Sequence, residues 1–386
     1  MHGSVTPPFS QHLLSLDIQQ SVSRSLLSTR ADVERVLAKD RYDLKDLPVL
    51  LSPASDHYLE EIAQKAHQLT VQRFGKIMQI FIPLYLSNEC HNTCTYCGFS
   101  QHLKFERSTL SDEAIISEAK LLSERGFRHL LLLTGEAKKT VGTSFIAHAI
   151  ELTAPYFDSI GIEVQPMEVD DYRLIRSKGC EWLTVYQETY EPKTYAAHHL
   201  FGKKRRFDYR LDTPERGAQA GFYQINLGVL LGLYDFRYEA IALASHLEFM
   251  QKKYWRSKYG VFFPCINSIH DPSIDLQINY PVSDPDFVKL ICTFRLLFPD
   301  LAITLSTRES PWLRDRLFKL GISSMSAESN TAPGGYSGSN SMGQFDTVDH
   351  RSLSEIKEHL ASEGYEAVMK DWEGTFPDRF QSVELC

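Results

Sequence analysis

The 386-residue sequence lacks any run of about 18 apolar residues, so no segment is expected to cross a membrane as a helix. The residues after Met1 also lack a positively charged stretch followed by a long apolar one, which argues against a secretory signal peptide. Positive charge is not in excess, and the formal net charge of −8 disfavours a general binder of nucleic acid or of anionic membranes. These absences predict a cytoplasmic protein.

The seven cysteines do not have the pattern of a disulfide framework. Their number is odd, and four of them are scattered singly along the chain: Cys180, Cys265, Cys292 and Cys386. The composition, with 43% hydrophobic and 23% charged residues, is typical of a globular protein with an ample core. The length suits one large α/β domain with appendages, since barrels of this kind commonly run to about 250 residues.

The other three cysteines form a compact motif. Cys90, Cys94 and Cys97 have the spacing C-x3-C-x2-C and follow an apolar run at 81–86. Thiolates at this spacing can bind three irons of one iron–sulfur cluster. A cubane cluster has four irons, so one iron keeps an open position, which indicates a reactive site rather than a structural one. The alternatives are three ordinary thiols, or a zinc site completed by a fourth ligand such as His91.

Hydrophobic periodicity divides the chain into three parts. Residues 1–75 are predicted to be a helical extension that caps the larger domain, with a capping box at Thr29 and Asp32 and a helix from about 56 to 74 that Gly75 ends. Eight apolar runs then alternate with amphipathic stretches. The runs are 77–86, 129–134, 159–164, 182–187, 224–230, 259–264, 302–307 and 322–326, and the predicted helices are 112–125, 168–178, 213–220, 238–254, 284–297 and 311–319.

This alternation predicts an α/β fold in which residues 76–328 form a closed TIM-type (β/α)8 barrel and residues 329–386 a C-terminal extension. An open doubly wound sheet is the alternative. In a barrel the reactive face lies where the strands end, and polar residues gather at five of the predicted strand ends. These residues include Thr134, Gly135, Glu136, Glu163, Glu188, Ser306, Arg308 and Ser326. Each one alone is explained by a structural role, but five such ends together indicate an active site.

The cysteine motif after a first strand resembles the signature of radical S-adenosylmethionine (SAM) enzymes. Thr134-Gly135-Glu136 is similar to their second-strand Gly-Gly-Glu element, which receives the methionine amine of SAM. Gly228 and Gly232 resemble their fifth-strand glycine motif near the adenine. The resemblance implies a [4Fe-4S] cluster on the three cysteines and SAM as the second cofactor. It also places Tyr96, Glu163 and Glu188 among the cofactor-binding residues.

The two glutamates are expected at the ribose hydroxyls of SAM, because one carboxylate can accept two hydrogen bonds. Either glutamate could instead organise a neighbouring arginine.

Longer phrases resemble one group within that superfamily, the aromatic amino acid lyases, and among them the tyrosine lyases. The phrases are PLYLSN at 83–88, YCGFS at 96–100, YQETY at 186–190, STRESPW at 306–312, PGGY at 333–336 and KDW at 370–372. The resemblance implies cleavage of the Cα–Cβ bond of L-tyrosine to 2-iminoacetate and p-cresol, with 5′-deoxyadenosine and methionine, for the thiazole of thiamine. It also implies a thiazole synthase as partner and a flavodoxin or ferredoxin as reductant.

A zwitterionic substrate needs a cation for its carboxylate and acceptors for its amine. Arg308 suits the carboxylate through its planar fork, with Ser306 and Ser326 as hydroxyl donors. Tyr85 is expected near the amine. The alternative for Arg308 is an ion pair with Glu309 or Glu328.

The chain departs from the family after the sixth strand, where Cys265 stands in place of an arginine. A thiol differs from a guanidinium in charge and reach, so the substrate rather than the radical chemistry is in question. A tryptophan lyase is therefore the rival enzyme. A relative that makes carbon monoxide and cyanide has a second, three-cysteine cluster site, which Cys386 alone cannot form. From another class, an iron–sulfur electron carrier would usually need a fourth close ligand.

One motif is left with a plain interpretation. The basic run 203–206 (KKRR) is expected to be a solvated loop, the usual fate of a short charge run, although it could touch a partner.

Overall fold

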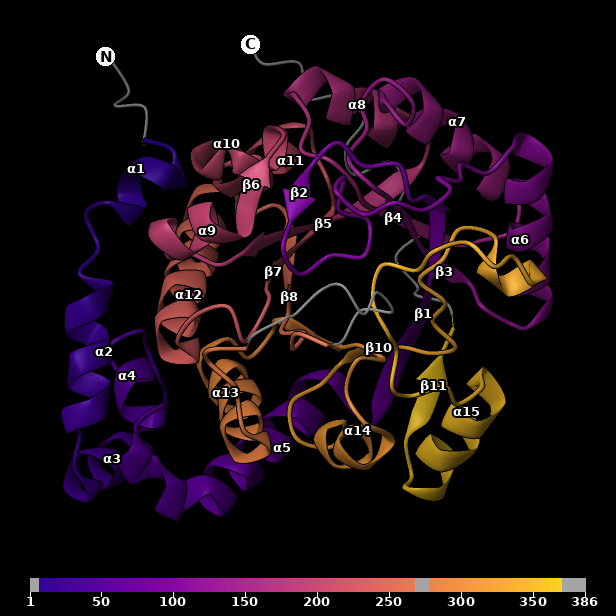
Figure 1. Cartoon of the computed structure of the whole chain (residues 1–386). Helices are drawn as coiled ribbons and strands as arrows, with labels where there is room; N and C mark the ends of the chain where they lie inside the picture. The colour runs from indigo at the N-terminus through magenta and orange to yellow at the C-terminus, as the bar shows by residue number, and fades with distance from the viewer. Residues whose placement is uncertain (1–6, 268–277, 370–386) are drawn as a thin grey trace, which may run out of the picture.

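Eight parallel strands close into a barrel in the computed structural model, which describes residues 7–267 and 278–369 (Figure 1). The strands are β1 (Ile77–Ser87), β3 (His129–Thr134), β4 (Ser159–Glu163), β5 (Cys180–Glu188), β7 (Gln224–Val229), β8 (Lys258–Phe262), β9 (Ala302–Leu305) and β10 (Ser324–Ser326). Pairing of β1 with β10 closes the ring, as in the register Ile80 to Met325. The predicted barrel is therefore confirmed, and the open sheet is excluded.

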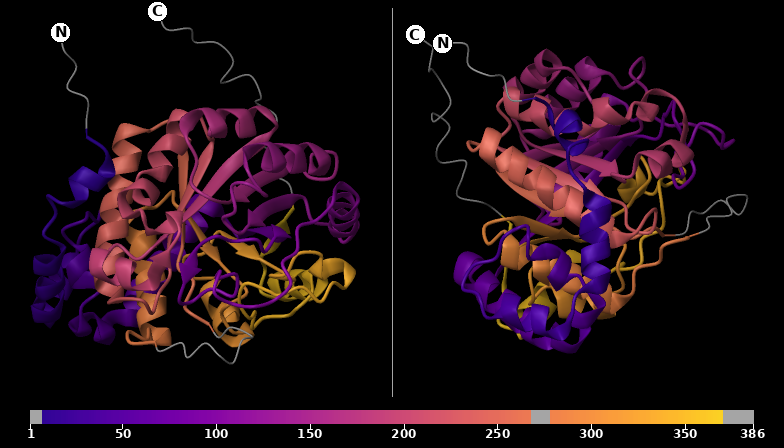
Figure 2. Two further views of the ribbon diagram at one scale, coloured as in Figure 1. Left: turned by 45° about the horizontal axis from the view of Figure 1, so that its top comes forward. Right: turned by 90° about the vertical axis from the view of Figure 1, so that its left-hand side faces the viewer.

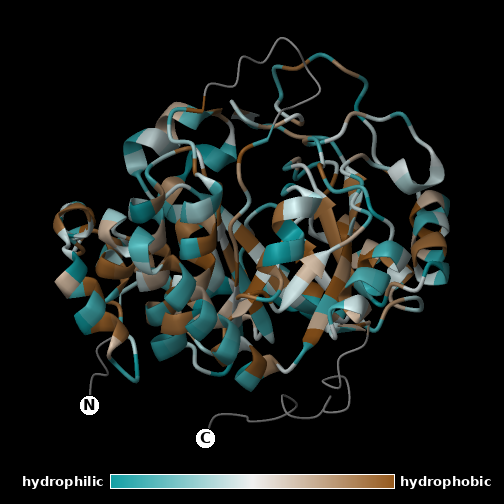
Figure 3. Ribbon diagram, turned by 90° about the horizontal axis from the view of Figure 1, so that it is seen from below, coloured by the Kyte–Doolittle hydropathy of each residue, from teal (hydrophilic) through white to brown (hydrophobic). Residues whose placement is uncertain are grey.

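Helices follow the strands and cover the outside of the barrel. They are α6 (Asp112–Glu124), α7 (Thr143–Thr153), α8 (Val169–Ser177), α11 (Thr213–Gln219), α12 (Phe236–Lys253), α13 (Asp284–Leu297) and α14 (Pro311–Leu317). Figure 3 shows the brown, apolar strands enclosed by helices whose outer faces are largely teal. Six of these helices match the predicted ranges, whereas α7 was not predicted.

The N-terminal helices flank the barrel on one side. They are α1 (Phe9–Leu13), α2 (Ile18–Leu27), α3 (Arg30–Leu37), α4 (Leu47–Leu50), the 3-10 helix η1 (Pro53–Tyr58) and α5 (Leu59–Phe74). Both views of Figure 2 show these indigo helices against the orange ones, and α2 packs on α12 while α5 packs on α13. The capping box of Thr29 and Asp32 is confirmed. Gly75 ends α5 with a φ of 66°, a conformation that favours glycine.

Two further groups of elements lie outside the ring of eight strands. After β10 come the 3-10 helix η3 (Gly335–Ser337), α15 (Leu353–Ser362) and β11 (Glu366–Val368), which pairs with the outer edge of β1. Between β5 and α11 lie α9 (Pro192–His198), β6 (His199–Phe201), the 3-10 helix η2 (Lys203–Arg205) and α10 (Phe207–Leu211). Strand β6 pairs with the two-residue strand β2 (Thr93–Cys94). Across the described ranges, no helix is both long enough and apolar enough to span a bilayer.

Aromatic side chains fill the barrel interior. Phe81 lies 6.0 Å from Trp182 and 6.3 Å from Phe262, measured between ring centroids, and both contacts are edge-on. Gly161 makes room for this layer, because a Cβ there would lie 2.0 Å from the indole of Trp182. The layer closes the barrel below its carboxyl end, so the space above it has an apolar floor.

Candidate active site

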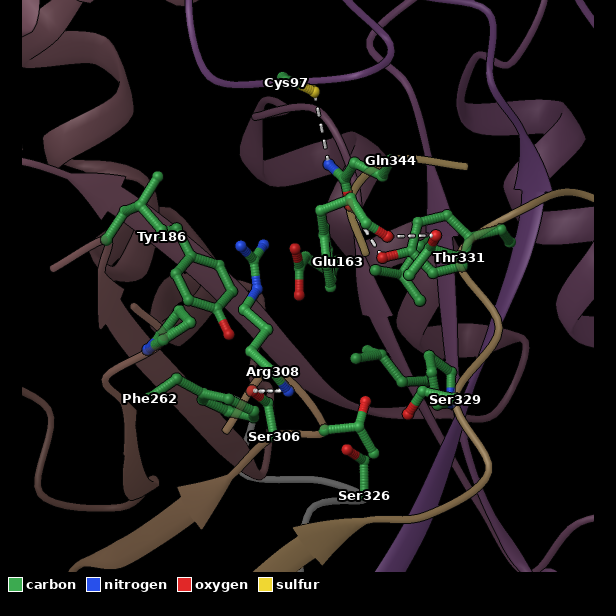
Figure 4. A pocket seen from close by; sticks show the side chains of 18 of the residues that line it. Cys97, Glu163, Tyr186, Phe262, Ser306, Arg308, Ser326, Ser329, Thr331 and Gln344 are labelled. Carbon is green, nitrogen blue, oxygen red and sulfur yellow. Dashed lines mark hydrogen bonds between the residues drawn. The ribbon is translucent and has the colours of Figure 1, made fainter. Parts of the chain in front are cut away.

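A cavity opens at the carboxyl end of the barrel, above the aromatic layer. About 100 Å³ of it is accessible to the centre of a water-sized molecule. Its walls come from most of the strand ends, from the cysteine loop and from the segment after β10. They include Tyr85, Tyr96, Cys97, Glu163, Tyr186, Glu188, Lys204, Phe262, Ser306, Arg308, Ser326, Ser329, Gln344 and Phe345 (Figure 4). Sequence-predicted residues from six separate segments therefore meet in one cavity.

The three motif cysteines lie on one loop that follows β1. Cys94 is buried, whereas Cys90 and Cys97 are partly exposed, and Cys97 lines the cavity. The side-chain amide of Gln344 donates a hydrogen bond of 3.8 Å to Cys97 Sγ (Figure 4). At the end of the loop Gly98 is packed so closely on the C-terminal segment that a Cβ would lie 2.5 Å from the carbonyl oxygen of Gly343. The cysteine loop is thus held in place by the segment that follows β10.

The thiols are close enough to influence one another. Burial raises the pKa of Cys90 to about 11, and the neighbouring charges of Glu136 and Cys97 add to the rise. Burial also raises the pKa of Cys94 and Cys97. Thiols in such surroundings stay protonated without a cation, and a bound metal centre reverses that preference. Three free thiols on one loop, one of them at the cavity wall, form a donor set that fits a multi-iron cluster. In residues 7–267 and 278–369 no three His, Cys, Asp or Glu side chains are placed to hold a single metal ion.

The end of β3 packs directly on the cysteine loop. A Cβ on Gly135 would lie 2.2 Å from the carbonyl oxygen of Glu89 and 3.1 Å from Cys90 Cβ, so only glycine allows this contact. The hydroxyl of Thr134 is buried and has no hydrogen-bond partner among the described residues. An unpaired buried hydroxyl beside the loop fits a polar ligand there.

Glu136 is held by two partners. It accepts hydrogen bonds from Asn92 at 2.8 Å and from Arg210 at 2.7 Å. Burial would raise the pKa of Glu136, but the charges of Arg210 and Lys204 lower it below its usual value. The carboxylate is therefore ionised and already oriented toward the cysteine loop.

Glu188 ends β5 in a strained conformation, with a φ of 73° that non-glycine residues rarely adopt. Its carboxylate forms an ion pair of 2.6 Å with Lys204 and lies 3.8 Å from Arg210. The prediction that the basic run 203–206 is a solvated loop is thus wrong for Lys204, whose side chain is only 12% exposed. The carboxylate of Glu188 draws this cation inward, and its contact with Arg210 agrees with the alternative considered for this glutamate.

Arg308 projects into the cavity from the loop after β9 (Figure 4). Its guanidinium carbon lies 3.3 Å from the ring centroid of Phe345, and one nitrogen lies 3.5 Å from the carbonyl oxygen of Cys265. Within the described residues it has no carboxylate at ion-pair distance. Glu309 instead accepts a hydrogen bond of 2.9 Å from Ser306, and Glu328 pairs with Arg125 at 3.0 Å. Most of the guanidinium donors therefore face the cavity.

The two serines predicted to act with Arg308 line the same cavity. Ser306 Oγ accepts a hydrogen bond of 3.2 Å from the backbone N–H of Arg308 and so orders the turn. Ser326 lines the cavity and is buried. Ser329, not predicted, lines it too, and its hydroxyl has no hydrogen-bond partner in the described part of the chain. Hydroxyls around a guanidinium suit an anionic group such as a carboxylate.

Glu163 and Tyr85 face the same space. Burial, together with the charge of Glu188, raises the pKa of Glu163 to about 7, so this carboxyl titrates near neutrality. The hydroxyl of Tyr85 donates a hydrogen bond of 2.8 Å to Oε1 of Gln344. Neither the raised pKa of Glu163 nor the hydrogen bond of Tyr85 identifies a ligand, so the roles expected for both residues remain predictions.

Gly228 lies in the fifth barrel strand, β7, and Gly232 lies just after it. A Cβ on Gly228 would lie 2.4 Å from the ring of Tyr186, which lines the cavity. Gly232 has a φ of 108°. Cys265, where the chain departs from the family pattern, forms an isolated parallel β-bridge with Leu231 through the backbone. Its neighbour Pro264 lines the cavity. The pair 370–371, Trp372 and Cys386 lie outside the described residues.

The site residues that sequence reasoning missed include Lys204, Arg210, Ser329, Gln344 and Phe345. Two of these five come from the segment between β5 and α11, and three from the segment after β10. No local pattern marks them, because their positions depend on how distant segments fold back over the barrel. The buried carboxylates at 136 and 188 were the available signal, since such groups need cations.

Two family models match the chain. The radical SAM superfamily model matches residues 84–244, and the model of the Biotin and Thiamin Synthesis associated domain matches residues 263–366. The two matches cover most of the barrel and most of the segment 329–386.

Full-length relatives give the same assignment. The chain is 42% identical over 371 residues to 2-iminoacetate synthase of Escherichia coli (strain K12), covering 95% of this chain and 97% of the relative. It is 42% identical over 351 residues to 2-iminoacetate synthase of Salmonella typhimurium, covering 89% and 91%. The crystal structure of HydG, a maturase of the [FeFe]-hydrogenase, has a TM-score of 0.89 at 30% identity, covering 93% of this chain and 81% of that one.

Proposed function

Because the chain belongs to the 2-iminoacetate synthase family of radical SAM enzymes, we propose that it cleaves the Cα–Cβ bond of L-tyrosine. The products are 2-iminoacetate, which supplies the thiazole of thiamine, and p-cresol, with 5′-deoxyadenosine and methionine from SAM. One observation carries the proposal. Arg308 and the cysteine loop face each other across a single cavity, so an amino acid held at its carboxylate lies next to the cofactor site.

The enzymes of this superfamily use a [4Fe-4S] cluster and SAM. Cys90, Cys94 and Cys97 would hold the cluster, since they are three thiols on one loop at the cavity wall. When bound, the cluster supplies one electron and SAM supplies the group that takes a hydrogen atom. Thr134 and Glu136 would hold the methionine part of SAM, because one has an unpaired hydroxyl and the other an oriented carboxylate.

The remaining cofactor assignments rest on position. Glu163 and Glu188 would contact the ribose, and Tyr96 together with the strand at Gly228 and Gly232 would border the adenine. Glu188 keeps one oxygen for Lys204, so it reaches a ribose hydroxyl with its other lone pairs.

The substrate assignments follow from charge and shape. Arg308 would bind the tyrosine carboxylate, because its fork is held flat on Phe345 and accepts a carboxylate in two parallel bonds. Ser306 and Ser326 would add hydroxyl contacts, and Tyr85, which lines the same cavity, would lie near the amine. The apolar walls at Leu131, Leu133 and Phe262 suit the aromatic ring.

Two partners complete the proposal. An imine hydrolyses in water, so 2-iminoacetate would pass to a thiazole synthase rather than diffuse away. A small acidic electron carrier, a flavodoxin or a ferredoxin, would supply the electron.

Product analysis tests the proposed reaction. Anaerobically reconstituted protein is incubated with SAM and dithionite, and with either tyrosine or tryptophan, and the products are identified by mass. We expect p-cresol from tyrosine and no cleavage of tryptophan. Cleavage of tryptophan alone would transfer the proposal to the rival lyase, with Cys265 as the residue to examine. A cluster spectrum that ignores SAM would favour an electron carrier.

A further inference from the structure

The segment 198–206, which contains β6 and η2, has an apolar outer face. Leu200 and Phe201 are 53% and 58% exposed, although neighbouring His199 is fully buried. Two large adjacent side chains left in water on one short strand are uncommon unless something covers them. The protein's own described residues leave both exposed.

Exposed cations follow this apolar pair in the chain. Lys203, Arg205 and Arg206 are exposed, and no carboxylate occurs between Glu191 and Asp208. The chain as a whole carries a formal net charge of −8, so this local excess of positive charge opposes the general trend. Lys204 does not contribute to it, because it pairs inward with Glu188.

The inner side of the same segment grips the cysteine loop. In the β2–β6 pair Thr93 lies opposite Phe201 and Cys94 opposite His199, so their Cα atoms are roughly 5 Å apart (Figure 1). The ring of His199 lies 2.6 Å from the hydroxyl of Tyr96. A protein seated on Phe201 would therefore lie one strand away from a cluster cysteine.

The turn at Gly202 makes this connection rigid. Its φ is 91°, and a Cβ there would lie 2.1 Å from Oδ1 of Asn92 and 2.6 Å from the carbonyl oxygen of His91. The backbone N–H of Lys204 donates a hydrogen bond of 3.0 Å to the same Oδ1. The exposed face is thus fixed to the loop rather than free to move.

We propose that this face, formed by Leu200, Phe201, Lys203, Arg205 and Arg206, docks an acidic protein that donates one electron to the site. An apolar centre with a cationic rim is the complement of an acidic redox partner, and the rim charges steer it to the docking position. The donor loses one electron and is oxidised. With the cluster and SAM bound, the electron would pass to SAM and break its C5′–S bond. This would give methionine and the 5′-deoxyadenosyl group, which would take a hydrogen atom from the substrate and leave as 5′-deoxyadenosine.

This inference rests on the proposed function, and the test separates the two by the choice of reductant. The charge-reversal variant Lys203→Glu, Arg205→Glu, Arg206→Glu is compared with Phe201→Ser and with a control, Arg24→Glu, Arg41→Glu, Lys45→Glu, whose exposed cations lie on the N-terminal side. Each reconstituted enzyme is assayed for 5′-deoxyadenosine with dithionite and with reduced flavodoxin. Binding of oxidised flavodoxin is measured separately by calorimetry.

We expect the charge-reversal variant to lose at least about tenfold in flavodoxin-driven rate and in flavodoxin affinity, while its dithionite-driven rate is unchanged. Phe201→Ser loses affinity with a smaller salt dependence, and the control behaves like the parent. Added salt should weaken binding to the parent, because rim charges are screened.

Other outcomes overturn the docking site. They are an unchanged flavodoxin rate and affinity, an equal loss with both reductants, or an effect confined to binding of a thiazole synthase or of a second copy of the chain. Deoxyadenosine without p-cresol would refute the proposed function alone.

Discussion

Arg308 is the residue on which the proposed substrate binding depends most directly. It reaches the cavity as a cation without an ion-pair partner among the described residues, stacked on Phe345. A half-buried guanidinium in this state is arranged for an anion that arrives later. Its alternative partners are engaged elsewhere, Glu309 with Ser306 and Glu328 with Arg125.

Arg308→Lys should separate substrate handling from SAM cleavage. Lysine keeps the charge but loses the fork and the stacking, and a displacement of about 1 Å can cost about 100-fold in rate. We expect p-cresol formed per deoxyadenosine to fall by up to about 100-fold and tyrosine to bind more weakly. Slow SAM cleavage without tyrosine should persist. The matched control is Arg125→Lys, and equal coupling in the two variants would remove Arg308 from the site.

The cysteine assignment makes a second prediction. Cys90→Ser, Cys94→Ser or Cys97→Ser should each lower the iron content after reconstitution and abolish deoxyadenosine formation, because each removes one thiolate. The control is Cys292→Ala, since Cys292 is buried in the cluster of apolar residues formed by the N-terminal helices and α13. Equal loss of iron in the control and in Cys94→Ser would show that the ligand assignment is wrong.

Among the site residues, those at strand ends could be predicted from the sequence, whereas those on segments that fold over the strand ends could not. Glu163 and Ser326 follow runs whose alternation is visible locally, so their position at the carboxyl end was predictable. Gln344 reaches Cys97 across 247 positions of the chain, and no local pattern reports such a contact. The inward turn of Lys204 depends on Glu188 in the same way.

At the scale of elements, strands were easier to predict than the short helices. Parallel strands buried on both faces appear as continuous apolar runs, and their predicted limits agree with the structure within a few residues. Helix α7 was not predicted, because its first residue follows Gly142, which provides no side-chain cap, and because it contains β-branched residues such as Ile146 and Thr153. The paired strands β2 and β6 are too short to carry a period.

Helix α12 holds the loop after β5 through one buried carboxyl. Glu239 accepts hydrogen bonds from the hydroxyl of Thr189 and from the backbone N–H of Tyr190, directly after Glu188. Burial raises the pKa of Glu239 to about 8, above its ordinary value of 4.5. The folded state therefore keeps a proton that the unfolded chain loses between pH 4.5 and 8. This group's contribution is fully present below pH 4.5 and is lost as the pH rises through about 8.

Glu239→Gln should remove this pH dependence, because the amide stays neutral and can bond the same two partners. The free energy of unfolding of the parent should fall relative to the variant by up to about 1.4 kcal/mol per pH unit across this window. Urea unfolding at several pH values between 5 and 8 measures it. The control is Glu248→Gln, a half-exposed glutamate on the same helix. Parallel curves for parent and Glu239→Gln would contradict the assignment.

At the scale of the whole molecule, the C-terminal part belongs to the site. Gln344 and Phe345 line the cavity, although they follow β10, the last barrel strand. We propose that the chain is organised as a helical extension at 1–75, a barrel at 76–328 and a C-terminal extension at 329–386. Residues between 329 and 345 of this extension cover the cavity. The closed barrel was predictable from the alternation of runs, whereas this cover was not.

A complex with a thiazole synthase is expected for the whole enzyme, because 2-iminoacetate is short-lived in water. Anaerobic pull-downs with SAM and tyrosine present should recover the synthase. The same pull-down with iron-depleted enzyme is the control: a lower yield of synthase there would show that the contact depends on turnover. No recovery under either condition would contradict direct transfer.

The most direct test of the central claim follows the fate of tyrosine carbon. Reconstituted protein, SAM and dithionite are incubated with tyrosine labelled with carbon-13 at Cα. The account predicts unlabelled p-cresol and label in 2-iminoacetate or its hydrolysis product glyoxylate, each in proportion to deoxyadenosine, with both lost in Cys94→Ser. Deoxyadenosine that accumulates while tyrosine stays intact would contradict it.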